Sequence, residues 1–307
     1  MPERERIPCA VCDSLDSRPV YRKFDLTVSR CARCGLVFAN PRATKEEIWR
    51  RYSPTYFWDE YLPAHGVANG RFDLAHFDSV HAQMLALIGA HVPARGRMLE
   101  VGTGAGFFLK AAERAGWQCA GFEVSPDAAA FARDRLSLDV QQGSAEEISY
   151  PPGTFDAAVL LEVIEHLLDP LRSLHSVWSS LKPGGAMLLS TPNFNALSRR
   201  ILGRQWAVIS PGEHLYYFTE PSLGALLARA GFVDVRFQRQ FPGFGLVGTM
   251  NATCTHEPKS RRAKLYRGAV HLFGDRVAGF VRGRGWGDTL LCVARRNSSR
   301  ISPLALP

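Results

Sequence analysis

A glycine-rich stretch that begins at residue 100 is the feature that most narrowly limits the fold of this chain. It reads Glu100-Val-Gly102-Thr103-Gly104-Ala-Gly106, follows a short apolar run and leads directly into a helical pattern. Glycines at such a strand-to-helix turn let the backbone approach a ligand whose polar end meets the helix N-terminus. The spacing is Gly-x-Gly-x-Gly, not the Gly-x-Gly-x-x-Gly of dinucleotide-binding enzymes, so the turn favours a ligand other than a pyrophosphate.

The sequence around this turn predicts an α/β fold. From residue 97 to 239, short apolar runs alternate with helical stretches, which is typical of a mostly parallel, doubly wound sheet. The predicted strands cover residues 98–101, 118–123, 155–161, 186–191, 233–238 and 289–294. A helix is predicted over residues 77–92, because apolar residues recur there at helical spacing. Its apolar side carries Val80, Met84, Leu87 and Ile88.

Composition and charge exclude several classes of protein. The 307 residues are 46% hydrophobic and 21% charged, as expected for a globular chain of two domains or of one domain with an appendage. No apolar run approaches the roughly 18 residues of a membrane span, and the charged start of the chain does not resemble a secretory signal. We therefore expect a cytoplasmic enzyme. The formal net charge is +8, and residues 259–284 carry eight basic residues against one acid.

Two cysteine pairs predict a metal site near the N-terminus. Cys9-x-x-Cys12 and Cys31-x-x-Cys34 are separated by 18 residues, the spacing of a four-cysteine zinc site. Each pair aims two sulfurs at one point, and the two pairs complete a tetrahedron. Four thiolates leave no open coordination position, so the predicted zinc is structural. A redox dithiol is the alternative, but this stretch lacks the βαβ context of such a motif.

A second acidic residue follows the next predicted strand. The sequence Gly121-Phe-Glu123-Val124 places a carboxylate at the strand tip, where it can accept both hydroxyls of a ribose. Together with the glycine-rich turn, this pattern resembles the class I S-adenosylmethionine-dependent methyltransferases over residues 97–240. The resemblance implies a Rossmann-like sheet of seven strands. It also implies that S-adenosylmethionine is bound by Glu100, Gly102, Thr103, Gly104, Gly106, Glu123, Val124, Ser144, Ala145 and Leu161.

The candidate catalytic residues follow the predicted strand at 155–161. Glu162, Glu165 and His166 lie within about one helical turn and could converge on one point. In the ubiquinone-biosynthesis O-methyltransferases and small-RNA 2′-O-methyltransferases that this motif resembles, the same pattern holds a divalent ion. The resemblance thus implies a Mg²⁺ site at these residues that polarises an acceptor hydroxyl. The alternatives are that His166 acts as a general base, or that the three residues only shape the loop.

A later loop supplies a second histidine. His214 lies in Pro-Gly-Glu-His-Leu-Tyr-Tyr-Phe-Thr, above the carboxyl edge of the predicted sheet. It could serve as a base or as a further ligand beside His166, or it could be a packed loop histidine. We expect Trp206, Tyr216 and Phe218 to contact the acceptor.

Two further segments have competing interpretations. The aromatic residues of the first are Trp49, Tyr52, Tyr56, Phe57, Trp58 and Tyr61. We expect them to pack between the zinc module and the next domain, with a substrate-facing wall as the alternative. The second is a basic insertion at 243–286, expected to form a helical lid over the acceptor site. Its alternatives are peripheral membrane contact through residues 259–284 and, less favoured, nucleic acid, since no aromatic-basic RNA motif occurs.

These features predict four regions. They are a zinc-binding module (1–42), an aromatic linker with a helix (43–96), a methyltransferase domain (97–296) and a loose tail (297–307). The predicted function is methyl transfer from S-adenosylmethionine to a hydroxyl of a small-molecule, glycan or lipid-linked acceptor. The alternatives are a zinc-containing RNA methyltransferase and a sugar or natural-product C-methyltransferase, because sugar C-methyltransferases with an N-terminal zinc module share this layout.

Overall fold

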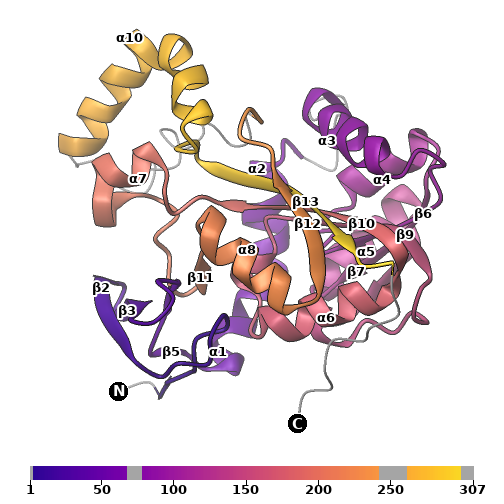
Figure 1. Cartoon of the computed structure of the whole chain (residues 1–307), viewed down its shortest axis with the longest axis horizontal. Helices are drawn as coiled ribbons and strands as arrows, with labels where there is room; N and C mark the ends of the chain where they lie inside the picture. The colour runs from indigo at the N-terminus through magenta and orange to yellow at the C-terminus, as the bar shows by residue number, and fades with distance from the viewer. Residues whose placement is uncertain (1–2, 68–77, 242–260, 299–307) are drawn as a thin grey trace.

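A seven-stranded sheet forms the centre of the computed structural model, which describes residues 3–67, 78–241 and 261–298 (Figure 1). In sheet order the strands are β12 (Phe232–Phe237), β13 (Thr289–Arg296), β10 (Leu181–Pro192), β9 (Phe155–Leu161), β6 (Arg97–Val101), β7 (Gln118–Glu123) and β8 (Val140–Gln142). β13 runs antiparallel to β10 and β12, whereas the other neighbours are parallel. The predicted α/β, Rossmann-like sheet is confirmed.

Helices cover both faces of this sheet. They are α3 (Asp78–His91), α4 (Phe107–Arg114), α5 (Pro126–Leu136), α6 (Pro170–Ser180) and α8 (Glu220–Arg229). Successive strand side chains point to opposite faces. Leu188 packs in a core with α3 and α4, while its neighbour Leu189 packs in a core with α6 and α8. Both faces of the sheet are therefore buried here, which explains why central strands such as β9 and β10 carry long apolar runs.

Local capping signals fix where three helices begin. Ser125, Asp169 and Thr219 each precede a proline in the first turn, and each side chain accepts a hydrogen bond from a backbone N–H two or three residues into the helix. Such a cap contributes about 1 kcal/mol of helix stability. Because α5 and α6 are the helices that follow β7 and β9, the first two caps also set loops at the carboxyl edge of the sheet.

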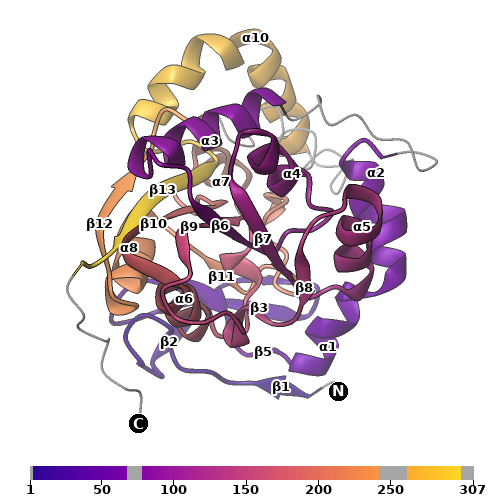
Figure 2. The same ribbon diagram turned by 90° about the vertical axis from the view of Figure 1, so that its right-hand side faces the viewer.

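The N-terminal module is built into the body of the protein. β1 (Arg4–Glu5) pairs with β5 (Arg42–Ala43), and β2 (Ser17–Lys23), β3 (Leu26–Cys31) and β4 (Val37–Ala39) form a second sheet. The fourth strand of that sheet is β11 (Tyr216–Tyr217), from the loop after β10. Phe38 shares a hydrophobic core with residues of α6 and α8. In Figure 2, the N-terminal strands lie below the main sheet. The loop that carries His214 is thus tied to the cysteine-containing module.

The linker and the insertion are both largely helical where they are described. The linker contains α1 (Lys45–Trp49), a 3₁₀ turn at Arg50–Tyr52, a π-helical turn at Tyr56–Tyr61 and α2 (Leu62–Ala64). The insertion forms α10 (Arg261–Gly283), which packs against α7 (Leu197–Leu202), whereas residues 243–260 of the predicted insertion lie outside the described residues. Phe77 and most of the predicted tail lie outside them too. None of the described helices is long and apolar enough to span a membrane.

Asp156 joins the starts of two strands and should make stability depend on pH. Its carboxylate accepts hydrogen bonds from the Arg97 N–H at 2.8 Å and from Lys182 Nζ at 2.8 Å. Although burial opposes its ionisation, these bonds lower the pKa of Asp156 below its usual value.

We expect Asp156→Asn to reduce the free energy of unfolding by about 1 kcal/mol at neutral pH. Since the wild type loses this contribution as its carboxyl is protonated, the difference should vanish as the pH falls through the folded-state pKa. Urea unfolding at several pH values measures it, and a pH-independent difference would contradict the assignment.

Candidate active site

The glycine-rich turn between β6 and α4 has the backbone that its sequence predicts. Gly102, Gly104 and Gly106 have φ angles of 72°, 51° and 83°, which side chains other than hydrogen rarely permit. Gly106 is the N-cap of α4, so the turn leads the chain from the sheet straight onto the helix. The Gly102 N–H donates to the Phe122 carbonyl at 2.7 Å, which holds the turn against β7.

Two buried carboxyls lie beside this turn. Glu123 accepts hydrogen bonds from the Gly104 N–H at 2.8 Å and from the Ser125 N–H at 2.9 Å, so it links the turn to the start of α5. Glu100 is 3% exposed and its Oε2 has no hydrogen-bond partner among the described residues. Burial, followed by the charge of Glu123, raises the pKa of Glu100 well above its usual value. The two carboxyls are therefore available to polar groups of a ligand bound in this turn.

A cavity of about 480 Å³ opens at the carboxyl edge of the sheet beside the turn. All the residues predicted to bind the cofactor line it except Gly106, which lies at the helix start behind the turn. Those residues are Glu100, Gly102, Thr103, Gly104, Glu123, Val124, Ser144, Ala145 and Leu161. The Ser144 hydroxyl accepts a hydrogen bond from the Glu146 N–H at 3.3 Å, so this side chain also caps the turn after β8. Residues from four strand ends therefore meet around one cavity.

Aromatic residues of the linker form a wall of the same cavity. They are Trp49, Tyr52, Tyr56, Phe57 and Tyr61. The alternative interpretation of this segment, a wall that faces the ligand, thus fits the structure better than packing alone. Phe57 also packs on Phe131 of α5 with ring centroids 5.7 Å apart, so the wall is anchored to the sheet domain. Tyr61 contacts the turn directly, because its hydroxyl accepts a hydrogen bond from the Ala105 N–H at 3.4 Å.

Sequence reasoning missed His65 and His81, which also line the cavity. The His65 ring stacks on Tyr61, with centroids 4.1 Å apart, and its Nδ1 lies 2.8 Å from the Tyr61 carbonyl oxygen. The spacing of four residues between Tyr61 and His65 was a usable signal, because residues i and i+4 are neighbours on a helix. His81 lies on α3 and had no comparable signal in the sequence.

Gly104 should be the least replaceable glycine of the turn. A Cβ placed there would lie 2.1 Å from the Tyr61 hydroxyl oxygen, and the φ of 51° is itself unfavourable for alanine. We expect Gly104→Ala to weaken the affinity for S-adenosylhomocysteine by at least about tenfold, measured by titration calorimetry. Gly116→Ala is the matched control: its φ is 91° and no atom lies within 4 Å of its Cβ position. An equal loss of affinity in both variants would point to general destabilisation and contradict the prediction.

A carboxylate and two histidines meet beside the cavity. Candidate ligand atoms of Glu165, His166 and His214 all lie within 4.8 Å of one another. The rings of His166 and His214 have centroids 4.7 Å apart, and His166 Nε2 lies 3.9 Å from Glu165 Oε1. His166 lines the cavity, while Glu165, 1% exposed, lies behind it. The loop after β9 and the loop after β10 thus supply one cluster.

Backbone carbonyls orient both histidines. His166 Nδ1 lies 2.9 Å from the Glu213 carbonyl oxygen, and His214 Nδ1 lies 2.8 Å from the Val208 carbonyl oxygen. Since a carbonyl only accepts, each Nδ1 carries the hydrogen, and in the neutral ring the lone pair is on Nε2. Burial lowers the pKa of His214, which favours the neutral form. Thr191 Oγ1 donates to Glu165 Oε2 at 2.9 Å, whereas Glu165 Oε1 has no hydrogen-bond partner among the described residues.

The structure differs from the predicted arrangement of this cluster at Glu162. We expected Glu162, Glu165 and His166 to converge, but the third member of the close cluster is His214. Glu162 has a φ of 55°, and its Oε1 accepts a hydrogen bond from Ser190 Oγ at 2.8 Å. Its side chain lines the cavity, and burial raises its pKa to about 7. Glu162 therefore lies outside the close cluster, although after burial its charge is the next cause of the raised pKa of Glu165, so the two carboxyls still interact.

One other expectation about the acceptor site is corrected. Trp206, Tyr216 and Phe218 are at most 3% exposed and do not line the cavity; they pack in the hydrophobic cores, because β11 is drawn into the sheet of the N-terminal module. The expected lid gains no support from the part of the insertion that the structure describes: none of those residues lines the cavity, and α10 packs on α7.

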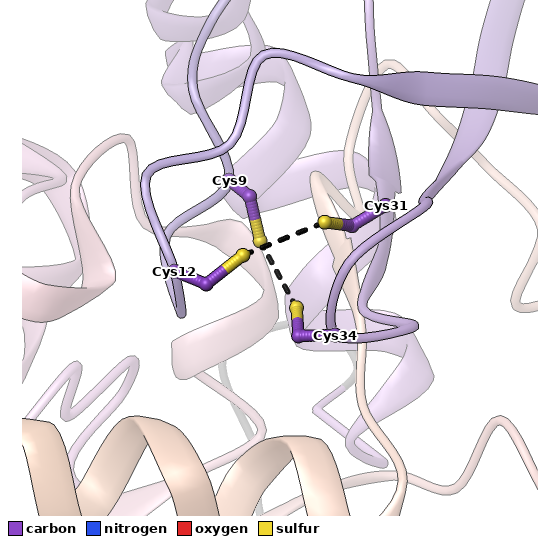
Figure 3. A group of neighbouring side chains, drawn as sticks. All are labelled: Cys9, Cys12, Cys31 and Cys34. Atoms are coloured by element: carbon purple, nitrogen blue, oxygen red, sulfur yellow. Dashed lines mark hydrogen bonds between the residues drawn. The ribbon is translucent and has the colours of Figure 1, made fainter.

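The four cysteines of the N-terminal module point toward one centre (Figure 3). Cys9 Sγ is 3.4 Å from Cys34 Sγ, and Cys12 Sγ is 3.6 Å from Cys31 Sγ. Sulfurs around a tetrahedral zinc are about 3.8 Å apart, given Zn–S bonds of about 2.3 Å. Burial alone would raise the pKa of Cys31, but hydrogen bonds from the backbone of Cys34 and Arg33 outweigh it and lower that pKa to about 7. The donor set and its geometry fit a structural zinc ion.

A short chain of backbone hydrogen bonds connects this module to the Glu165 cluster. The Ala39 N–H of β4 donates to the Leu215 carbonyl at 2.8 Å, and the Leu215 N–H donates to the Glu165 carbonyl at 2.7 Å. Leu215 adjoins His214. The position of both cluster loops therefore depends on β4, which pairs with the strand that ends in Cys31.

Comparisons with known proteins agree with this architecture. The chain matches the model of a family described as "Methyltransferase domain" over residues 69–236. It is 29% identical over 188 residues to a ubiquinone biosynthesis O-methyltransferase of Cereibacter sphaeroides, covering 57% of this chain and 76% of the relative. A ubiquinone biosynthesis O-methyltransferase of Xanthomonas campestris is 32% identical over 180 residues, 54% of this chain and 70% of the relative. The fold resembles phosphoethanolamine N-methyltransferase 2 of Haemonchus contortus in complex with S-adenosyl-L-methionine, with a TM-score of 0.54 and 18% identity over 85% of this chain and 62% of that one.

The sheet order, the glycine-rich turn and the acid at the tip of β7 define a class I S-adenosylmethionine-dependent methyltransferase. The chain belongs to the methyltransferase domain family, which its model matches over more than half of the sequence. The predicted enzyme class is confirmed.

Proposed function

We propose that this methyltransferase transfers the methyl group to a hydroxyl oxygen of a small-molecule, glycan or lipid-linked acceptor. The observation that carries the proposal is His166, which lines the cavity with its Nε2 beside Glu165 and His214. A hydroxyl is a poor nucleophile until its proton is removed, and a neutral imidazole is suited to that task. The relatives named as O-methyltransferases support the same type of acceptor atom.

The roles of the other residues follow from their places around the cavity. The turn at Gly102–Gly104 and the carboxylate of Glu123 would hold S-adenosylmethionine, with Val124 against its adenine. The aromatic wall that contains Tyr52 would cover an apolar or planar part of the acceptor. Holding the acceptor oxygen in line with the sulfonium methyl supplies much of the rate in a displacement reaction.

Glu165, His166 and His214 would also fit a divalent cation. Two imidazole nitrogens and one carboxylate oxygen match the preferences of transition ions such as Zn²⁺, Fe²⁺ or Mn²⁺ better than those of Mg²⁺, which prefers oxygen ligands. The hydrogen bonds from each Nδ1 to a carbonyl are the contacts usually found behind metal-bound histidines. When bound, such an ion would lower the pKa of an acceptor hydroxyl.

The test combines binding and product analysis. Purified protein should bind S-adenosylmethionine and S-adenosylhomocysteine with one zinc per chain, and Glu123→Ala should lose the binding. With radiolabelled methyl donor, we expect transfer to catechol, sugar or lipid-linked hydroxyl acceptors and an acid-stable methyl ether as product. Failure of folded protein to bind the cofactor would contradict the site assignment. Methylation of carbon or nitrogen alone would contradict the proposed acceptor atom.

A further inference from the structure

We propose that one face of α10 is a docking surface for an anionic lipid bilayer. The helix buries Tyr266, Val270 and Val281, each at most 8% exposed, against the body of the protein. On another side it exposes Leu265 at 75% and Leu272 at 71%. Phe280, 59% exposed, follows eight residues after Leu272. At about 100° per residue, these three apolar side chains project from one side of the helix.

Basic residues flank this apolar stripe. The 23 residues of α10 contain six arginines and lysines against one acid. Arg261, Arg262, Lys264 and Arg267 are all exposed, and the ion pairs found among the described residues include none of them. Cations around exposed leucines are the pattern of a helix that lies in the interface of an anionic membrane.

An aromatic and arginine cluster extends the surface at the end of α10. Phe280 and Trp286 meet edge to face with centroids 6.5 Å apart. The Arg284 guanidinium lies 4.8 Å from the Phe280 ring centre, and that of Arg200 lies 4.9 Å from the Trp286 ring centre. Tryptophan and arginine are favoured at the headgroup level of a bilayer, where the ring is half buried and the cation meets phosphate.

Position and charge favour a bilayer over other occupants. In Figures 1 and 2, α10 stands at one end of the molecule, away from the N-terminal module, so a flat surface can reach it. A second copy would place these cations opposite identical cations, which opposes association. RNA would satisfy the arginines but would leave Leu265 and Leu272 in water. Of these three occupants, only a bilayer accommodates both the basic and the apolar side chains.

The test is flotation of the full-length protein with phosphatidylcholine vesicles, with and without phosphatidylglycerol, at low and high salt. We expect binding that requires phosphatidylglycerol and weakens with salt. Leu265→Ser should weaken it about tenfold. Arg261→Glu/Arg262→Glu should weaken it about fivefold for each cation removed, and more through the added acids.

Matched variants on the N-terminal module control for exposure and charge. Leu15 is also 75% exposed, so Leu15→Ser tests loss of an equally exposed leucine; Arg18→Glu/Arg22→Glu makes the same change in net charge. Both should leave vesicle binding unchanged, and all variants should retain their affinity for S-adenosylhomocysteine.

Four results would overturn the proposal. The first is wild-type protein that does not float with the anionic vesicles, and the second is a loss of binding in the control variants as strong as that in the α10 variants. Tighter binding to single-stranded RNA that depends on the arginines alone would identify a nucleic-acid site instead. If the protein does not bind vesicles but forms a dimer that Leu265→Ser dissociates, the surface is an interface between copies.

Discussion

His166→Ala should lower the turnover number by about 10²- to 10⁴-fold, the range that general acid–base catalysis contributes. The side chain lines the cavity, and its Nδ1–H is held by the Glu213 carbonyl at 2.9 Å, so Nε2 presents a lone pair beside Glu165. His214→Ala should have a comparable effect if the two rings act as one cluster. Affinity for S-adenosylhomocysteine should change less than about threefold in either variant, because the glycine-rich turn lies on other strand ends. Initial rates and calorimetry measure the two quantities separately.

His91→Ala is the control for loss of an imidazole, because His91 ends α3 and does not line the cavity. The pH profile distinguishes two roles for His166. A general base gives a rate that falls as the imidazole is protonated and that does not respond to added Zn²⁺ or Mn²⁺. If His166 is a metal ligand, metal-free protein should have a low rate, and adding one of these ions should restore it. Unchanged turnover in both His166→Ala and His214→Ala would rule out either role.

Removing the proposed zinc from the four-cysteine site should reduce turnover by about 10- to 100-fold without abolishing cofactor binding. The reason is the hydrogen-bond path from β4 through Leu215 to Glu165, which connects the histidine loop to the four-cysteine module. Losses of this size are typical when a group that orients an active residue is removed. Cys31→Ser combined with Cys34→Ser removes two ligands and gives the same test without chelators. Zinc content, turnover and affinity for S-adenosylhomocysteine should be measured on the same samples.

Cys119→Ser is the matched control, because that thiol lies on β7 outside the cluster. It should retain zinc, turnover and cofactor affinity. Full turnover in zinc-free Cys31→Ser/Cys34→Ser protein would show that the module does not position the active site. Loss of cofactor affinity together with turnover would show that the module supports the whole fold, and would contradict the local path proposed here.

Features carried by contiguous residues could be predicted from the sequence. Each of these features is a short stretch whose spacing can be seen in the sequence itself. They are the turn from Glu100 to Gly106, the acid at Glu123 and the cysteine pairs that begin at Cys9 and Cys31. Six of the seven sheet strands were also predictable, because burial on both faces leaves apolar runs in the central strands. The edge strand β8 was not predicted, because its three residues Val-Gln-Gln form no apolar run. Boundaries were less predictable: β10 begins at Leu181 rather than 186, since a register shift lets the turn before it join the pairing.

The make-up of the candidate active site was decided by contacts between distant segments. His214 joins Glu165 and His166 because β11 pairs with β4, a contact between residues about 180 positions apart. The same pairing buries Tyr216, which the sequence alone placed near the acceptor. The left-handed backbone of Glu162 turns that carboxylate toward Ser190, although its spacing suggested a shared site. Local spacing thus determined the glycine-rich turn and the four-cysteine cluster, whereas tertiary pairing brought His214 to Glu165 and His166, because side chains from separate loops meet only once the strands between them have paired.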